Sequence, residues 1–309
     1  MDDALLRQRV YEITRGHALC VSIIGTLWLE QEEPPFTFVD FPKLQEKFNE
    51  RALLEFVQKR LDERLGTPFR ELTRYSVLLR SFDLPTLRAV FPEYFSGPDA
   101  IERFHQFIRY PYIEAIGNQH YAFHDLLREL QAIEVREQEP ELWKRYHKRA
   151  LEYLTQVAIF SPDWYYHAIA YNEEQGMSDW WNATQDLRHT GTAYLRALFQ
   201  AAHDVTLKLT PISLAQRSLL LGRFYYSSYG SHLTTALESY EQALSLFRQV
   251  SSKLGEANVR KAMGNVQQFR DEREAALESY EQALSLFRQV GDRLGEANVL
   301  QAMGDVQQF

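Results

Sequence analysis

An internal duplication towards the C-terminus constrains the fold of this chain more than any other feature of the sequence. Residues 237–250 (LESYEQALSLFRQV) recur unchanged as residues 277–290. Six of the 34 aligned positions in 236–269 and 276–309 differ. The differing pairs are Ser251/Gly291, Ser252/Asp292, Lys253/Arg293, Arg260/Leu300, Lys261/Gln301 and Asn265/Asp305. A fixed period of this size is typical of stacked helical or mixed units that bury their apolar faces against one another.

Each unit reads as two amphipathic helices, because apolar residues recur on one face at the 3.6-residue spacing. They are Leu237, Tyr240, Ala243, Leu244 and Phe247 in one helix, and Leu254, Ala257, Ala262, Met263 and Val266 in the other. Gly264 interrupts the latter helix, where glycine costs about 1 kcal/mol relative to alanine. We therefore expect a neighbouring helix to cross there too closely for a Cβ atom.

These residues resemble the tetratricopeptide repeat. The family's pair of a large apolar residue and glycine is found at 263–264 and 303–304, and its small–aromatic–small series is found twice in the second helices. That series comprises Ala236, Tyr240 and Ala243, and then Ala276, Tyr280 and Ala283. A diverged unit fits Leu221-Gly222 with Tyr225. The resemblance implies an α-solenoid of helical hairpins over residues 213–309.

In this family the first helix of each repeat lines a concave groove that binds a protein or peptide. The resemblance therefore implies a partner-binding groove formed by Asn258, Lys261, Asn265, Gln268, Asn298, Gln301, Asp305 and Gln308. Three of the six differences between the repeats fall in the first helix. We expect them to alter the choice of partner without unfolding the array; neutral drift on a solvated face is the alternative.

The duplication stops within a repeat, because Phe309 ends a first helix. Repeat arrays normally close with a polar cap. The expectation from this pattern is a fragment of a longer protein, whose uncovered stripe favours self-association. The stripe comprises Leu294, Ala297, Ala302, Met303 and Val306.

The N-terminal half has a different pattern. Short amphipathic helices are predicted over 53–65, 69–79, 84–91 and 99–109, and Gly117-Asn118 separates two segments suited to a β-hairpin. Helices followed by one small hairpin predict a winged-helix domain over residues 43–136. The aromatic-rich stretch 137–212 predicts irregular helical hairpins.

Two short motifs resemble signal-transducing NTPases of the STAND (NB-ARC-like) type. Phe123-His124-Asp125 matches their Met-His-Asp motif, and Gly16-His17-Ala18-Leu19 matches their Gly-x-Pro-Leu motif. The resemblance implies that residues 1–42 are the remnant of a helical subdomain. It also implies that His124 lies near the β-phosphate of ADP, and Gly16 and Ala18 near the adenine, in a longer parent. The alternative for His124-Asp125 is a helix start, with Asp125 as its cap.

No G-x-x-x-x-G-K-[ST] phosphate loop occurs in the sequence. ADP or ATP is therefore expected only with an upstream NTPase core in the parent, and no cofactor is expected for this chain. The nine histidines are not spaced as metal ligands are. No serine lies in a G-x-S-x-G motif, which would place it as a nucleophile. We predict neither catalytic residues nor a metal site.

Composition limits the partners and the compartment. The net charge of −8 disfavours nucleic acid, whose binding depends on Lys and Arg. Cys20 is the only cysteine, which excludes an internal disulfide. It lies in the apolar run 18–29, which at about 12 residues is too short to span a bilayer. Asp2 and Asp3 argue against a signal peptide, so a cytoplasmic protein with no membrane partner is expected.

Three classes of function remain open. The favoured class is a non-catalytic protein-interaction scaffold, the sensor and regulatory half of a STAND-type signalling protein. The second is a stand-alone adaptor of tetratricopeptide repeats. The third is a DNA-binding regulator that uses the winged helix directly, for which 99–109 offers only Arg103 and Arg109 against Asp99 and Glu102.

Overall fold

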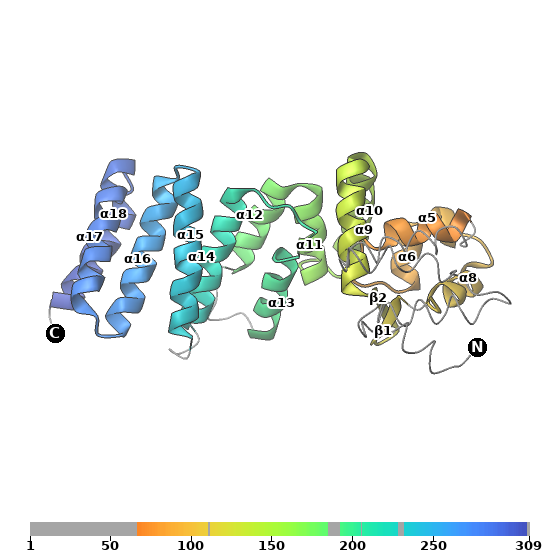
Figure 1. Ribbon diagram of the computed structural model, residues 1–309, viewed down its shortest axis with the longest axis horizontal. Helices are drawn as coiled ribbons and strands as arrows, with labels where there is room; N and C mark the ends of the chain where they lie inside the picture. Colours follow the sequence, from red (N-terminus) through yellow and green to blue (C-terminus); the bar gives the residue numbers. More distant parts are fainter. Residues whose placement is uncertain (1–66, 111, 185–191, 205, 228–231, 308–309) are drawn as a thin grey trace, which may run out of the picture. The chain divides into compact units, whose positions relative to one another are not determined.

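The computed structural model describes residues 67–307, apart from 111, 185–191, 205 and 228–231 (Figure 1). These residues form 14 helices and one two-stranded antiparallel sheet, so the prediction of a mainly helical chain with one β-hairpin is confirmed. The chain divides into two compact units, one up to Val157 and one from Ala158 onward.

The first unit consists of helices and one β-hairpin, and its assignment as a winged helix stays a prediction. Its helices are α5 (Thr67–Ser76), α6 (Leu84–Val90), α7 (Pro92–Phe95), α8 (Ala100–Phe107), α9 (Asp125–Gln138) and α10 (Pro140–Val157), and its strands are β1 (Ile113–Gly117) and β2 (His120–Phe123). The predicted hairpin is confirmed, but its turn residues are Asn118 and Gln119, with φ of 50° and 61°, and Gly117, with φ of 98°, is the last residue of β1. Phe82, between α5 and α6, also pairs with Tyr121 of β2 in an isolated antiparallel β-bridge. The sequence pattern did not indicate this pairing.

Aromatic rings fill the core under the hairpin. Phe82 is fully buried, and its ring centroid lies 5.9 Å from that of Phe107 in α8 and 5.7 Å from that of Phe123 in β2. Tyr112 stacks on Phe123 at 6.0 Å. These contacts fix the hairpin against the helices, because aromatic pairs at such distances contribute energy beyond the burial of their area.

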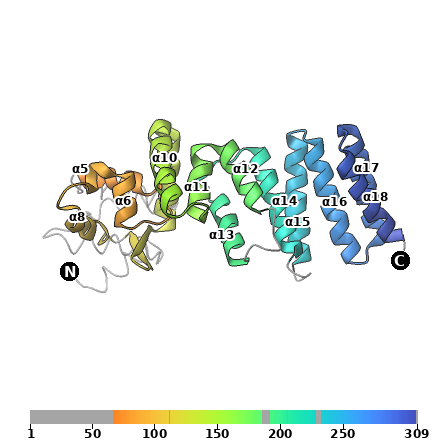
Figure 2. The ribbon, with the colours of Figure 1, turned by 180° about the vertical axis from the view of Figure 1, so that it is seen from behind.

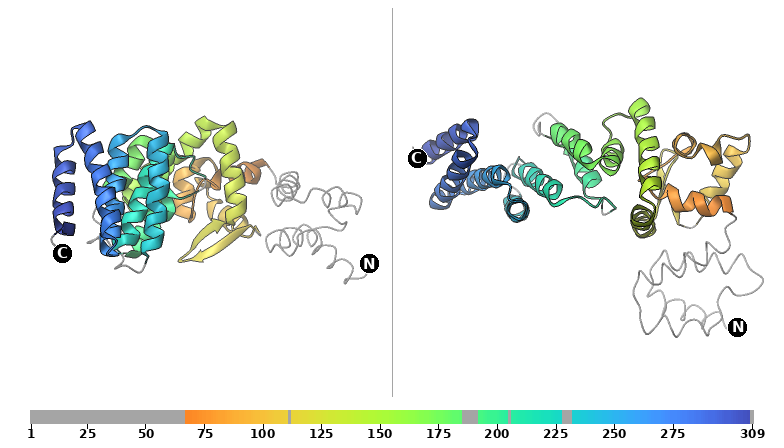
Figure 3. Two further views of the ribbon diagram at one scale, coloured as in Figure 1. Left: turned by 60° about the vertical axis from the view of Figure 1, so that its left-hand side comes forward. Right: turned by 90° about the horizontal axis from the view of Figure 1, so that it is seen from above.

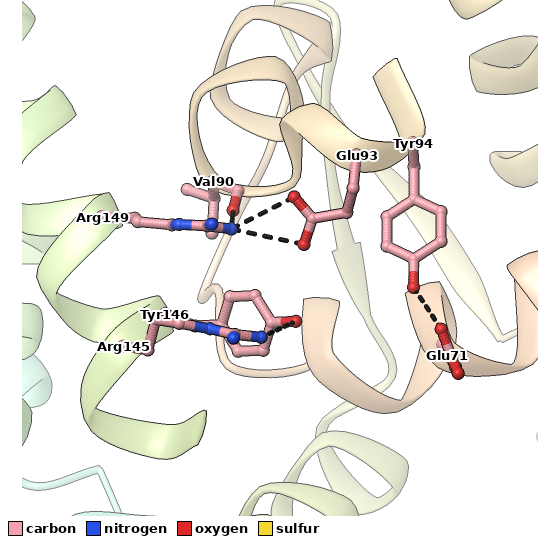
Figure 4. Close-up of polar contacts among 7 residues, drawn as sticks. All are labelled: Glu71, Val90, Glu93, Tyr94, Arg145, Tyr146 and Arg149. Carbon is pink, nitrogen blue, oxygen red and sulfur yellow. Dashed lines mark hydrogen bonds and ion pairs between the residues drawn. The ribbon is translucent and has the colours of Figure 1, made fainter. Parts of the chain in front are cut away.

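Helix α10 packs within this first unit, although the sequence pattern grouped it with the hairpins that follow. Arg149 reaches the junction between α6 and α7 (Figure 4), where its Nη1 donates to the Val90 carbonyl at 2.9 Å and to Glu93 at 3.2 Å. The Val90 carbonyl lies at the C-terminal end of α6, where carbonyls lack helical partners. Tyr146 packs beside it against Phe91, with 4.8 Å between ring centroids.

The second unit consists of helical hairpins. They are α11 (Pro162–Tyr171), α12 (Glu173–Thr184), α13 (Thr192–Ala202), α14 (Pro211–Ser227), α15 (Leu233–Gln249), α16 (Lys253–Phe269), α17 (Arg273–Val290) and α18 (Arg293–Gln307). Successive helices from α14 to α18 run side by side in opposite directions (Figure 2), and Figure 3 follows them from two further sides. The two helices predicted for each repeat are confirmed.

A glycine meets an aromatic ring at each of the four junctions between consecutive helices from α14 to α18. A Cβ atom on Gly264 of α16 would lie 2.5 Å from the Tyr280 ring of α17, which confirms the close crossing expected there. The other pairs are Gly222 with Tyr240, Gly255 with Phe247, and Gly295 with Phe287. All four rings are almost fully buried. Any larger residue than glycine would therefore force the helices apart.

The turns after α15 and α17 explain two of the six differences between the repeats. Gly291 ends α17 with φ of 73°, and Ser251 occupies the same position after α15 with φ of 57°. The next residue caps the following helix in both repeats: Ser252 Oγ accepts from the Gly255 amide at 3.3 Å, and Asp292 Oδ1 accepts from the Gly295 amide at 2.9 Å. Both repeats keep one turn geometry with different residues.

The glycine contacts predict opposite effects for one substitution at two equivalent positions. Gly264→Ala should lower the stability by about 1–2 kcal/mol, because overpacking against Tyr280 outweighs the gain in helix propensity. Gly304→Ala should raise it by up to about 1 kcal/mol, because a Cβ on Gly304 meets nothing within 4 Å among the described residues. Thermal unfolding followed by circular dichroism measures both. Equal melting temperatures would contradict the assigned contact.

The two residues with positive φ after α15 and α17 lead to a second prediction, on a matched pair of substitutions. Ser251→Gly should raise the stability by about 0.5–1 kcal/mol, because a non-glycine residue is strained at positive φ. Gly291→Ser should lower it by a similar amount. Urea unfolding of the two variants tests the prediction, which fails if the two substitutions shift the midpoint in the same direction.

Candidate protein-binding surface

The first helices of the repeats form a continuous surface. Helix α14 contacts α16, and α16 contacts α18, in addition to the contacts within each hairpin. We define the first-helix face by the predicted groove residues within the described chain: Asn258, Lys261, Asn265, Gln268, Asn298, Gln301 and Asp305. Gln308, also predicted for the groove, lies outside the described residues. The first-helix face is polar and rich in amides.

On α16, two of these residues also hold the next helix. The Tyr280 hydroxyl of α17 lies 2.8 Å from Asn265 Oδ1 and 2.9 Å from Gln268 Oε1, and it shares its one proton between these two acceptors. Burial raises the pKa of Tyr280, and neighbouring Tyr226 and Asp305 raise it further, so the hydroxyl remains a donor. Two of the polar side chains predicted to bind a partner therefore take part in hydrogen bonding within the array. The sequence pattern did not indicate these contacts.

Lys261 is a half-buried cation on the first-helix face. Burial lowers the pKa of its ammonium group, Arg223 of α14 lowers it further, and Asp292 opposes both effects. The Arg223 guanidinium lies 5.9 Å from the centre of the Trp181 ring in α12. Two cations from neighbouring first helices therefore interact on this surface.

The polar residues of α18 are more exposed than their equivalents on α16. Asn298, Gln301 and Asp305 are exposed, whereas Asn258, Lys261 and Asn265 are intermediate. The predicted uncovered stripe of α18 is only partly present. Leu294 is 73% exposed, but Val306 is buried against α17.

A cavity of about 560 Å³ lies between α12 and α14. Its lining residues are Glu173, Glu174, Met177, Ser178, Trp181, Thr210, Ile212, Ser213 and Gln216. Glu173 Oε1 accepts from both the amide and the hydroxyl of Thr210 at 2.7 Å, which ties the start of α14 to α12. The sequence pattern missed this cavity, because its walls come from two helices that are not consecutive in the chain and share no repeated sequence.

The structure describes only some of the residues that were predicted to lie near a nucleotide. His124 is the residue before α9, its side chain makes no capping bond, and its amide donates to the Tyr112 carbonyl at 3.0 Å. Asp125 is the first helical residue, so it is not the cap proposed for it. Gly16 and Ala18 lie outside the described residues. Nucleotide proximity therefore stays a prediction.

Two other kinds of site are absent from the described part of the chain. No group of three or more His, Cys, Asp or Glu residues there could hold a metal ion. No helix among residues 67–307, within the described ranges, is both long and apolar enough to cross a membrane.

Comparison with known proteins supports the repeat. Residues 232–289 match the family model of the tetratricopeptide repeat, so the prediction is confirmed for that segment. Helical hairpins of this kind generally form protein-interaction modules. No catalytic domain is recognised in the chain. No curated protein sequence matches it significantly.

One solved structure is similar over most of the chain. It is a Signal Transduction ATPase with Numerous Domains (STAND) protein with a tetratricopeptide repeat sensor from Pyrococcus horikoshii. The alignment covers 96% of this chain at 13% sequence identity, with a TM-score of 0.36. This chain spans about half the length of that protein, since 53% of it is covered.

We predict that residues of the first-helix face can be exchanged between the two repeats with little loss of stability. Arg260→Leu, Lys261→Gln and Asn265→Asp together should leave the melting temperature within about 3 °C, because none alters a glycine contact. The aspartate introduced in place of Asn265 can still accept from the Tyr280 hydroxyl. The reverse swap at 300, 301 and 305 is the control. A drop of more than about 8 °C would mean that these side chains are structural.

Proposed function

We propose that this chain is a non-catalytic protein-interaction scaffold whose first-helix face binds a segment of a partner protein. The observation that carries the proposal is the distribution of the six differences between two otherwise identical repeats. Three lie in the first helix and three in or beside the turn, whereas both repeats keep the glycine–aromatic contacts between helices. Variation therefore falls outside the glycine–aromatic contacts, although Asn265 also accepts a hydrogen bond from Tyr280.

The chemistry of the first-helix face suits a polypeptide ligand. Amide side chains such as Asn258 and Asn298 both donate and accept hydrogen bonds, as does a peptide backbone. Lys261 would pair with a carboxylate of the same segment. The proposed ligand is therefore an extended or helical protein segment that carries at least one acidic residue.

We further propose that the scaffold is the sensor and regulatory half of a STAND-type signalling protein. The order of modules expected from the sequence supports this role: a predicted winged helix, predicted irregular hairpins and then repeats, with His124-Asp125 at the start of α9. An upstream NTPase core in a longer protein would supply the nucleotide site. A stand-alone adaptor is the second candidate, and a phosphate loop encoded upstream of Met1 would decide between them.

The DNA-binding alternative is weakened by helix α8. Its exposed residues include Ile101, Glu102, His105 and Gln106, and Arg103 donates to the Tyr94 carbonyl within the domain. Within the segment 99–109, only Arg109, just beyond the helix, adds an exposed positive charge. Phosphate binding depends on several such charges.

The binding proposal is tested by comparing matched surface variants. Asn258→Glu with Lys261→Glu changes the first-helix face, and Glu241→Lys with Glu281→Lys changes exposed positions of the second helices. A partner captured from the native organism by the wild type should be lost with the first pair and kept with the second. Titration calorimetry with the purified partner should show at least a tenfold loss for the first pair alone. Equal affinities would contradict the proposal.

The non-catalytic role predicts no measurable ATP hydrolysis by this chain, because the phosphate loop and its lysine are absent from the sequence. Phosphate release is measured on material purified over two independent columns. Turnover that persists at constant specific activity through both columns would contradict the role.

A further inference from the structure

The cavity between α12 and α14 is larger than ordinary helix packing leaves. The two helices contact each other (Figure 1), although α13 lies between them in the chain. Protein interiors are packed as densely as organic crystals and leave few voids larger than a water molecule. A volume of about 560 Å³ lies instead in the range of sites that bind small molecules.

Each of the two helices presents one face to the cavity. On both helices the lining residues are close together or recur at intervals of three or four, as residues on one side of a helix do. They are Glu173, Glu174, Met177, Ser178 and Trp181 on α12, and Ile212, Ser213 and Gln216 on α14. Each face includes a serine, whose short side chain occupies little of the space between the helices.

The charged side chains that line the cavity are carboxylates. Glu173 is held in place, because its Oε1 accepts from the amide and the hydroxyl of Thr210 at 2.7 Å. Glu174 is exposed and makes no hydrogen bond or ion pair with the described residues. Both belong to the first turn of α12, where the helix dipole of about half a unit charge offsets only part of the two negative charges. No Lys, Arg or His is among the described residues of the lining, so the cavity favours a cation.

The rest of the lining offers an apolar surface beside these carboxylates. Met177 is 2% exposed, Trp181 is half-buried, and Ile212 is 38% exposed. The Arg223 guanidinium already lies 5.9 Å from the centre of the Trp181 ring. We therefore expect the indole to provide apolar contact rather than a place for a second charge. The cavity combines an acidic end with apolar side chains, as a site for a molecule with a charged head and an apolar body would.

We propose that this cavity binds a small organic cation, in which an ammonium group is joined to an apolar body. The ammonium group pairs with Glu174, and the apolar body packs against Met177, Trp181 and Ile212. The site shares no residue with the first-helix face. It therefore does not rest on the proposed binding of a partner protein.

The probes are three molecules with the same indole body and different charges: tryptamine, tryptophol and indole-3-propionate. Ligand-observed NMR titration of the whole chain should give saturable binding of tryptamine, with a dissociation constant on the order of 1 mM or tighter. Tryptophol, which is neutral, should bind at least fivefold more weakly. Indole-3-propionate should bind more weakly still, because its carboxylate meets two others.

Two variants at exposed positions of the lining locate the binding. Glu174→Lys should weaken the binding of tryptamine at least tenfold and strengthen that of indole-3-propionate, and this reversal is not expected from a loss of structure. Ser178→Trp should weaken the binding of tryptamine and tryptophol alike, because the larger side chain fills the cavity. Glu241→Lys is the matched control, since it changes an exposed carboxylate of α15 outside the cavity. Asn258→Glu with Lys261→Glu should leave tryptamine binding unchanged, which separates this site from the first-helix face.

Several outcomes would overturn the proposal. One is the absence of saturable tryptamine binding up to the solubility limit of the probe. Another is equal binding of all three probes, which would mean that the carboxylates do not select the ligand. A tryptamine affinity that Glu174→Lys changes no more than Glu241→Lys does would place the binding outside this cavity.

Discussion

The packing of an aromatic ring on a glycine is the contact on which the repeat array depends. It occurs at four successive junctions, from Gly222 with Tyr240 to Gly295 with Phe287. Without a Cβ atom the two helices approach closely, and the ring then covers the backbone that the glycine exposes. Because each ring also belongs to the core of its own hairpin, the same contact sets the spacing within a repeat and between repeats.

In the proposed function, this arrangement separates stability from recognition. The aromatic rings and glycines face inward and are the same in both repeats, whereas residues 260, 261 and 265 differ from 300, 301 and 305 without touching those contacts. The separation is incomplete, because Asn265 also accepts from Tyr280. The equivalent residue of the next repeat is Asp305, which has a carboxylate in place of the amide and is exposed.

The sequence predicted the repeat helices and the hairpin because both depend on local signals. Apolar spacing and a costly internal glycine define the helices, and Gly117-Asn118 marks the hairpin. Contacts between distant residues leave no such signal. The bridge between Phe82 and Tyr121 involves a single residue on the Phe82 side. The sequence around Phe82 therefore shows no alternation of apolar and polar residues typical of a strand. The bond from Arg149 to the Val90 carbonyl and the cavity beside Trp181 depend on how helices pack.

The central claim is that the first-helix face is where a partner protein binds. Site-specific photo-crosslinking in the native cell tests it most directly, with a photoreactive residue at 261 or 301 on that face and at 241 or 281 on the second helices. All four positions tolerate a change without disturbing a glycine contact. The account predicts a crosslinked product of one defined mass from 261 and 301 and none from 241 and 281. Crosslinks confined to 241 and 281 would contradict it.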